Sequence, residues 1–323
     1  MRKDLFLVSF SMLLCTVAQV NSQSKKIPAP AIQQEEIKRD LFALADDHFR
    51  GREAGTLDEL KASVWLAELA RKAGLEPAGD DGTYFQFYSL LRERVSDHST
   101  VKIGNRTFSL WKDVIIWEPS FASVDAPIVF VNNPDQVDEE TIKGKVVALQ
   151  FTEQDLTDPR KIIPWRYVSL VVQNCVKKLA AKGAKAILFV SDDRAEQAWA
   201  RAIQDRIRGT YRIDGRPSRQ LLSGVPIIWV GAAALDLVRV PNQNLQANVY
   251  AETFTYPSVN VVAKVKGTDP TLANEYVLFS GHTDHDGVRN IEPGKDSILN
   301  GADDNATACA ALLAIGRAFH KQP

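Results

Sequence analysis

Hydrophobic residues repeat with helical spacing in four stretches of the chain. The stretches are 37–44, 60–69, 171–182 and 306–319. Apolar positions three or four residues apart form one face of a helix, so each stretch predicts a helix with a buried side. Thr56 and Glu59 form a capping-box pattern before the second stretch, and Gly74 follows it as a stop signal. Gly183 ends the third stretch in the same way.

Shorter apolar runs predict strands. They cover 127–131, 145–151, 186–190, 225–230, 258–265 and 276–280. Most are continuous apolar runs, which is typical of strands buried on both faces of a parallel sheet. The predicted fold class is therefore α/β: a central mixed, largely parallel sheet flanked by helices, with an inserted small strand-rich α/β domain.

The first 22 residues have the composition of a secretory signal peptide. Arg2 and Lys3 precede an apolar run, and Val20-Asn21-Ser22 offers small residues for cleavage. The run is short and contains hydroxyl side chains, so we expect no stable membrane insertion after signal cleavage. The expected location is secreted or periplasmic.

Composition excludes several classes of function. The 323 residues include 39 basic and 40 acidic ones, for a formal net charge of -1, which offers no basic field for nucleic acid. Behind the signal segment only Cys175 and Cys309 remain, so a disulfide scaffold is excluded and a single bridge stays open. The chain has no G-x-S-x-G elbow, no H-E-x-x-H helix and no glycine-rich phosphate loop.

Candidate metal ligands gather near the end of the sequence. His282 and Asp284 follow the apolar run 276–280, and Asp303-Asp304-Asn305 precedes the last helix. Strand ends and helix starts meet at one edge of a parallel sheet, so these side chains can converge on one cation. Taken singly, a structural histidine and a helix cap explain the same residues. A calcium loop does not, because the EF-hand spacing fails at 284–287.

These motifs resemble a known family. Gly281-His282-Thr283-Asp284 and Gly301-Ala302-Asp303-Asp304-Asn305 resemble the signature of the secreted di-zinc aminopeptidases, metallopeptidase family twenty-eight. The block Gly51-Arg52-Glu53-Ala54-Gly55-Thr56 resembles the N-terminal region of bacterial members. The resemblance implies a zinc-dependent exopeptidase with two Zn²⁺ ions that removes N-terminal residues from peptide substrates.

The resemblance also implies roles for single residues. His282 would bind one zinc ion, and Asp304 would bridge both. Asp284 would act as the catalytic-site residue that orients the His282 ring. Asp303 stands where the family tolerates Asn, so it receives no metal. In the family a Glu-Glu pair, an Asp and a His lie downstream of the point that corresponds to Pro323, so we expect a C-terminally truncated chain that is inactive as a fragment.

The predicted domains follow the change from helical to strand-rich patterns. The segments are a signal peptide at 1–22, the N-terminal part of a peptidase domain at 23–119, an insert at 120–252, and the continuation of the peptidase domain at 253–323. The insert resembles the protease-associated domain in its strands at 144–149 and 225–228 and its turn at 180–186. Two other functions stay open: a noncatalytic peptide- or protein-binding relative, and a glutaminyl cyclase-like enzyme with a single zinc.

Overall fold

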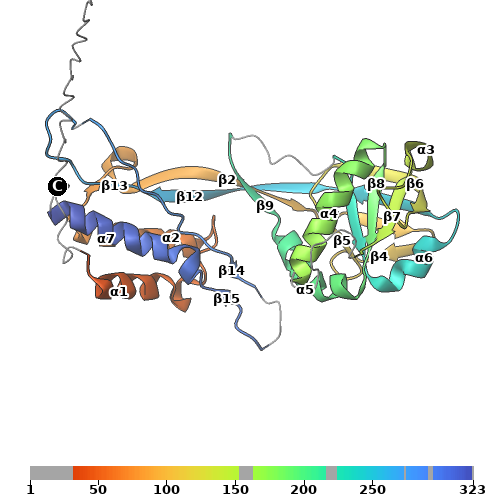
Figure 1. Cartoon of the computed structure of the whole chain (residues 1–323), viewed down its shortest axis with the longest axis horizontal. Coiled ribbons are helices and arrows are strands. Elements are labelled where there is room, and N and C mark those ends of the chain that lie inside the picture. Colours follow the sequence, from red (N-terminus) through yellow and green to blue (C-terminus); the bar gives the residue numbers. More distant parts are fainter. Residues whose placement is uncertain (1–31, 153–162, 216–223, 273, 290–293, 322–323) are drawn as a thin grey trace, which may run out of the picture.

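The structure is a computed structural model that describes residues 32–152, 163–215, 224–272, 274–289 and 294–321. The predicted signal peptide lies outside these residues. Figure 1 shows two groups of elements joined by a long ribbon of β2 (Phe85–Val95) and β12 (Ala251–Val261). We call them the helical lobe (32–84 and 262–321) and the sheet lobe (96–250).

The helical lobe is built on three of the four predicted helices. They are α1 (Gln34–Leu44), α2 (Leu57–Lys72) and α7 (Thr307–Lys321). Their apolar faces meet in one small core that includes Leu44, Leu66 and Leu313. The helices at 37–44, 60–69 and 306–319 are thus confirmed. The Thr56 hydroxyl accepts the N–H of Glu59 at 3.4 Å, as the capping pattern predicts.

Short strands complete the helical lobe. They are β1 (Glu76–Pro77), β13 (Ala263–Lys264), β14 (Gly287–Val288) and β15 (Ile298–Leu299). β1 pairs with β13 and β14 with β15, both antiparallel. The predicted strand at 258–265 corresponds to the end of β12, which pairs with β2, followed by β13.

The sheet lobe contains an eight-stranded mixed sheet in the order β4-β3-β11-β6-β7-β8-β10-β5. The strands are β3 (Thr100–Ile103), β4 (Arg106–Phe108), β5 (Val114–Ile116), β6 (Ala122–Phe130), β7 (Val146–Gln150), β8 (Ala186–Val190), β10 (Ile227–Val230) and β11 (Asn244–Val249). The central strands β6, β7, β8 and β10 run parallel, and the outer pairings are antiparallel. All four strands predicted between 127 and 230 are present.

Helices cover both faces of this sheet. They are α3 (Glu139–Ile142), α4 (Pro164–Ala181), α5 (Asp193–Arg208) and α6 (Leu235–Arg239). Val147 and Leu149 of β7 face a core shared with α4 and α5, whereas Val146 and Ala148 face a second core that includes Val238 of α6. This alternation explains the unbroken apolar runs, because the central strands are buried on both sides. The predicted α/β class, with a mixed sheet flanked by helices, is confirmed.

The sheet lies across the segment of the predicted insert, 120–252, and also includes β3, β4 and β5 from the segment 23–119. These strands pair with β11 and β10, so their ladder hydrogen bonds tie them to the sheet lobe. The arginine-rich segment after residue 193 forms α5 and then β9 (Thr210–Ile213). Asp192 caps α5 by accepting the N–H of Ala195 at 2.7 Å.

The strand predicted at 276–280 is wrong. The segment is extended without any strand partner among the described residues, and Tyr276, Val277 and Leu278 are 79%, 82% and 86% exposed. An apolar run becomes a central strand only when neighbouring strands take up its N–H and C=O groups, and the sequence of the run does not specify those neighbours.

A cluster of ion pairs joins the two lobes. The Glu53 carboxylate accepts hydrogen bonds from Arg208 at 2.7 Å, from the Tyr211 hydroxyl at 3.1 Å and from Arg289 at 3.2 Å. Asp286 adds a contact of 3.4 Å to Arg208. Arg289 is only 5% exposed, so its positive charge is balanced by these carboxylates rather than by water. We call the cluster of Glu53, Arg208, Tyr211, Asp286 and Arg289 the joint.

None of the described helices is both long enough and apolar enough to cross a bilayer.

The joint gives the first prediction. Exchanging Glu53→Gln, Arg208→Gln and both together is expected to yield a coupling energy of about 1–3 kcal/mol in a double-mutant cycle of denaturant unfolding, because the pair is largely buried. The exposed pair Glu68–Arg71 on α2 has a similar N–O distance, 2.8 Å, and serves as the control with less than about 1 kcal/mol. Equal coupling in both pairs would contradict a structural role for the joint.

Glu59 gives a second prediction, on pH dependence. Its carboxylate is buried and accepts hydrogen bonds from Ser258 Oγ and from the N–H of Gly55, both at 2.6 Å. Burial raises the pKa of Glu59 above its ordinary value. A raised pKa means that the folded state binds the proton more tightly than the unfolded state, so stability falls as pH rises through the window above the ordinary value.

Replacing Glu59→Gln removes this titration. The variant is therefore expected to gain stability relative to the parent chain as pH rises above 4.5, the ordinary pKa of this group, when the melting temperatures of both are compared across a pH series. Glu68→Gln on the same helix is the control. The pKa of the exposed Glu68 is lowered to about 2, first by its hydrogen bond with Arg71, so it provides no such gain. A constant difference between Glu59→Gln and the parent would refute the assignment.

Candidate metal centre

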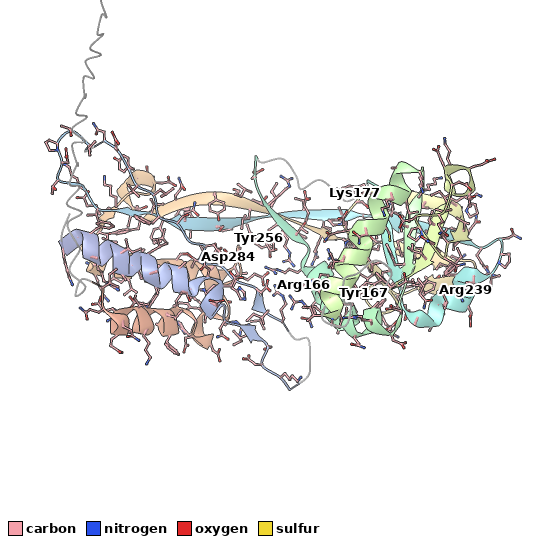
Figure 2. The ribbon with its side chains drawn as sticks, viewed as in Figure 1. Arg166, Tyr167, Lys177, Arg239, Tyr256 and Asp284 are labelled. Carbon is pink, nitrogen blue, oxygen red and sulfur yellow. The ribbon has the colours of Figure 1, made fainter. Side chains whose placement is uncertain are left out.

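The predicted site residues lie on two segments that meet beside the start of α7. His282 and Asp284 belong to an irregular segment that has no strand partner among the residues the structure describes. Asp304 lies in a turn, η6 (Ala302–Ala306), that leads into α7, and its φ of -116° and ψ of 87° are not helical. The Cys309 thiol of α7 donates to the carbonyl oxygen of His282 at 3.4 Å, which fixes one segment against the helix. In Figure 2 Asp284 lies in the helical lobe, away from the labelled residues of α4.

The structure brings His282 and Asp304 into contact. His282 Nε2 lies 3.0 Å from Asp304 Oδ1. On the other side of the ring, Nδ1 lies 3.0 Å from the backbone oxygen of Asp284 and 3.5 Å from its Oδ1. Both ring nitrogens thus face oxygen atoms that can only accept, and a neutral ring, which has one N–H, leaves one nitrogen lone pair against an oxygen.

The contact between His282 and Asp304 suits a cation. A nitrogen lone pair and a carboxylate oxygen 3.0 Å apart repel each other unless a positive charge lies between them. The His282 side chain is 51% exposed and that of Asp304 69%, so a metal ion can reach the pair from solvent. The two side chains can therefore share a metal ion.

His285 lies near the same carboxylate. Its Nδ1 is 4.0 Å from Asp304 Oδ2, and its side chain is 22% exposed. His285 is not among the predicted metal ligands, because in the family that the motifs resemble a histidine is frequent at this place without being a ligand. Its backbone N–H donates to the carbonyl of Arg52 at 3.2 Å, so its position depends on a contact that is distant in sequence.

The donor chemistry of the pair fits zinc, which binds imidazole nitrogen and carboxylate oxygen in proteins. In the part of the chain that the structure describes, no three His, Cys, Asp or Glu side chains are arranged to hold a metal ion. The pair can thus supply two donors.

Burial raises the pKa of Cys309, so its thiol stays protonated at neutral pH and serves as a donor to the backbone. Cys175 and Cys309 are both free, so the bridge left open above is not formed.

The site segments match a known family of sequences. Residues 260–323 match the description Peptidase family M28. The match takes in His282, Asp284 and Asp304, and it leaves the sheet lobe outside. No curated protein matches the chain.

Solved structures give a weaker likeness. An aminopeptidase from Aneurinibacillus sp. strain AM-1 is 19% identical, with 90% of this chain and 60% of that chain covered and a TM-score of 0.46. BSAP, a zinc aminopeptidase from Bacillus subtilis, is 15% identical, with 90% and 58% covered and a TM-score of 0.44. A Peptidase M28 precursor from Shewanella amazonensis SB2B is 16% identical, with 93% and 63% covered and a TM-score of 0.42. The chain thus spans about 60% of the length of these proteins.

A prediction concerns Gly301, which opens the turn that carries Asp304. Its φ is +60°, and a Cβ there would lie 2.4 Å from the Asp304 carbonyl oxygen and 2.4 Å from His285 Cγ. Gly301→Ala is expected to lower the free energy of unfolding by about 1–3 kcal/mol, from backbone strain and the displaced neighbours. Gly144→Ala is the control, because Gly144 has a φ of +74° with open space around it. An equal loss of unfolding free energy in both variants, measured by denaturant unfolding, would contradict the close contacts predicted for a Cβ at position 301.

Proposed function

We propose that this chain carries zinc-binding residues of an aminopeptidase, an exopeptidase that hydrolyses N-terminal residues from peptides. The observation that carries the proposal is the contact of 3.0 Å between His282 Nε2 and Asp304 Oδ1, with Asp284 behind the ring. The match of residues 260–323 to Peptidase family M28 supports the same chemistry for the same residues.

Each of the three site residues has a separate proposed role. His282 and Asp304 would hold zinc, and the second carboxylate oxygen of Asp304 is free to bind a second ion, as the family resemblance suggests. Asp284 keeps the Nδ1 proton of His282 in place, which fixes the tautomer and raises the basicity of Nε2. Bound zinc would polarise the scissile carbonyl and lower the pKa of a water molecule toward neutral. Because the side chains are open to solvent, a peptide can approach from outside.

Two donors do not complete a zinc site, so further ligands and a general base would have to come from other residues than His282 and Asp304. The proposal includes export, which rests on the composition of residues 1–22, and a protease-associated character of the sheet lobe, which rests on the patterns at 144–149 and 225–228.

Zinc titration tests the proposal. Calorimetry with the parent chain is expected to show zinc binding, and His282→Ala and Asp304→Asn are each expected to weaken it by at least about tenfold, since each removes a donor. Asp303→Asn is the matched control for the neighbouring carboxylate, and His98→Ala, an exposed histidine of the sheet lobe, is the control for a lost imidazole.

The outcomes separate the functions. Absence of zinc binding by the parent chain, or equal affinity in the site variants, would contradict the proposed metal centre. Release of free amino acids from short peptides by the zinc-loaded parent chain would support the aminopeptidase. Zinc binding without such release would contradict it and favour the noncatalytic binding relative.

A further inference from the structure

Arg52 is the most deeply buried charged residue next to the candidate metal centre. Its side chain is fully buried, at 0% exposure. The guanidinium donates four hydrogen bonds, all to backbone carbonyl oxygens. Nε donates to Thr283 at 2.7 Å, Nη1 donates to Leu44 at 2.6 Å and Asn300 at 2.7 Å, and Nη2 donates to Gly301 at 3.0 Å.

These carbonyls belong to the two segments that carry the site. Thr283 lies between His282 and Asp284, and Gly301 begins the turn that carries Asp304. One planar group thus fixes both segments, and through Leu44 it also ties them to α1. The fork of an arginine side chain has five N–H donors in fixed directions, so the four bonds define a distance and an angle between the segments.

Backbone carbonyl groups stabilise the buried positive charge of Arg52. Burial lowers the pKa of Arg52, and the nearby charge of Asp284 acts in the opposite direction. Among the described residues no carboxylate forms an ion pair with Arg52, so the carbonyl dipoles replace water around the charge. A buried charge is tolerated only when such hydrogen bonds satisfy it.

The backbone at Gly51 and Arg52 adopts left-handed conformations. Arg52 has a φ of +49°, in the left-handed region that disfavours residues with a Cβ. Gly51 has a φ of +71°, and a Cβ there would lie 2.4 Å from the Leu299 carbonyl oxygen and 2.7 Å from that of Gly287. Such strain persists only where surrounding contacts hold it, and it is concentrated at functional sites.

We infer that Arg52 is a positioning residue for the metal centre, which holds the segments of His282 and Asp304 at the separation at which both can bind one cation. The inference rests on the proposed function for the identity of the ligand. The positioning role depends only on the four hydrogen bonds of Arg52, and their effect on the two segments can be measured in the absence of metal.

Two variants and one control test this role. Arg52→Met removes every donor, and Arg52→Lys keeps the charge but concentrates its donors on one nitrogen atom. Arg50→Met is the matched control. Arg50 is the same residue type two positions earlier and also has a positive φ, +47°, but its side chain is 55% exposed and forms an ion pair with Asp58 at 3.5 Å.

Each protein is examined by two measurements. Calorimetric titration with zinc gives the dissociation constant, and amide hydrogen exchange followed by mass spectrometry reports on peptides that cover 282–287 and 298–306. Both Arg52 variants are expected to raise the dissociation constant by about 10- to 100-fold, as loss of a residue that orients metal ligands does. Exchange is expected to accelerate in both segments and not in the sheet lobe. Arg50→Met is expected to stay within roughly twofold of the parent chain.

The inference is overturned if exchange in the two segments is unchanged in both Arg52 variants, or if it accelerates everywhere, which would assign Arg52 a role in general stability. It is overturned as well if zinc binds the parent chain and both variants equally. If the parent chain binds no zinc, the proposed function fails, and the exchange data alone decide whether Arg52 positions the two segments.

Discussion

One buried guanidinium group connects the segments from which the helical lobe builds its site. Arg52 donates to the backbone of α1, of the His282 segment and of the turn before Asp304. The next residue, Glu53, faces the other way and accepts hydrogen bonds from Arg208 and Tyr211 of the sheet lobe. Two adjacent side chains therefore fix the internal geometry of the site and the docking of the second lobe.

The two lobes are stabilised in different ways. The sheet lobe has a core on each face of its sheet, with central strands buried on both sides, so apolar burial dominates its stability. The core of the helical lobe is small, and the exposed apolar residues from Tyr276 to Phe279 add nothing to it. There the positions of the loops depend on polar contacts of buried charges, which are directional and fix geometry more closely than apolar packing does.

Local patterns in the sequence were enough to predict the helices at 37–44, 60–69, 171–182 and 306–319 and the strands between 127 and 230, and short motifs pointed to His282 and Asp304. Each of these depends on periodicity, a capping signal or a short motif, which are properties of neighbouring residues. The absence of a strand at 276–280 could not be predicted, because a strand is defined by its partners. The roles of Arg52 and Glu53 were also hidden. Their motif was recognised, but the contacts of Arg52 span up to 249 positions of sequence.

The central claim is that His282 and Asp304 share a cation, and anomalous diffraction at the zinc absorption edge tests it most directly. In crystals of this chain grown with zinc, the account predicts an anomalous peak at roughly 2.0–2.2 Å from both His282 Nε2 and an oxygen of Asp304. A peak at other residues, or an ordered His282–Asp304 contact with no metal between the two side chains, would contradict it.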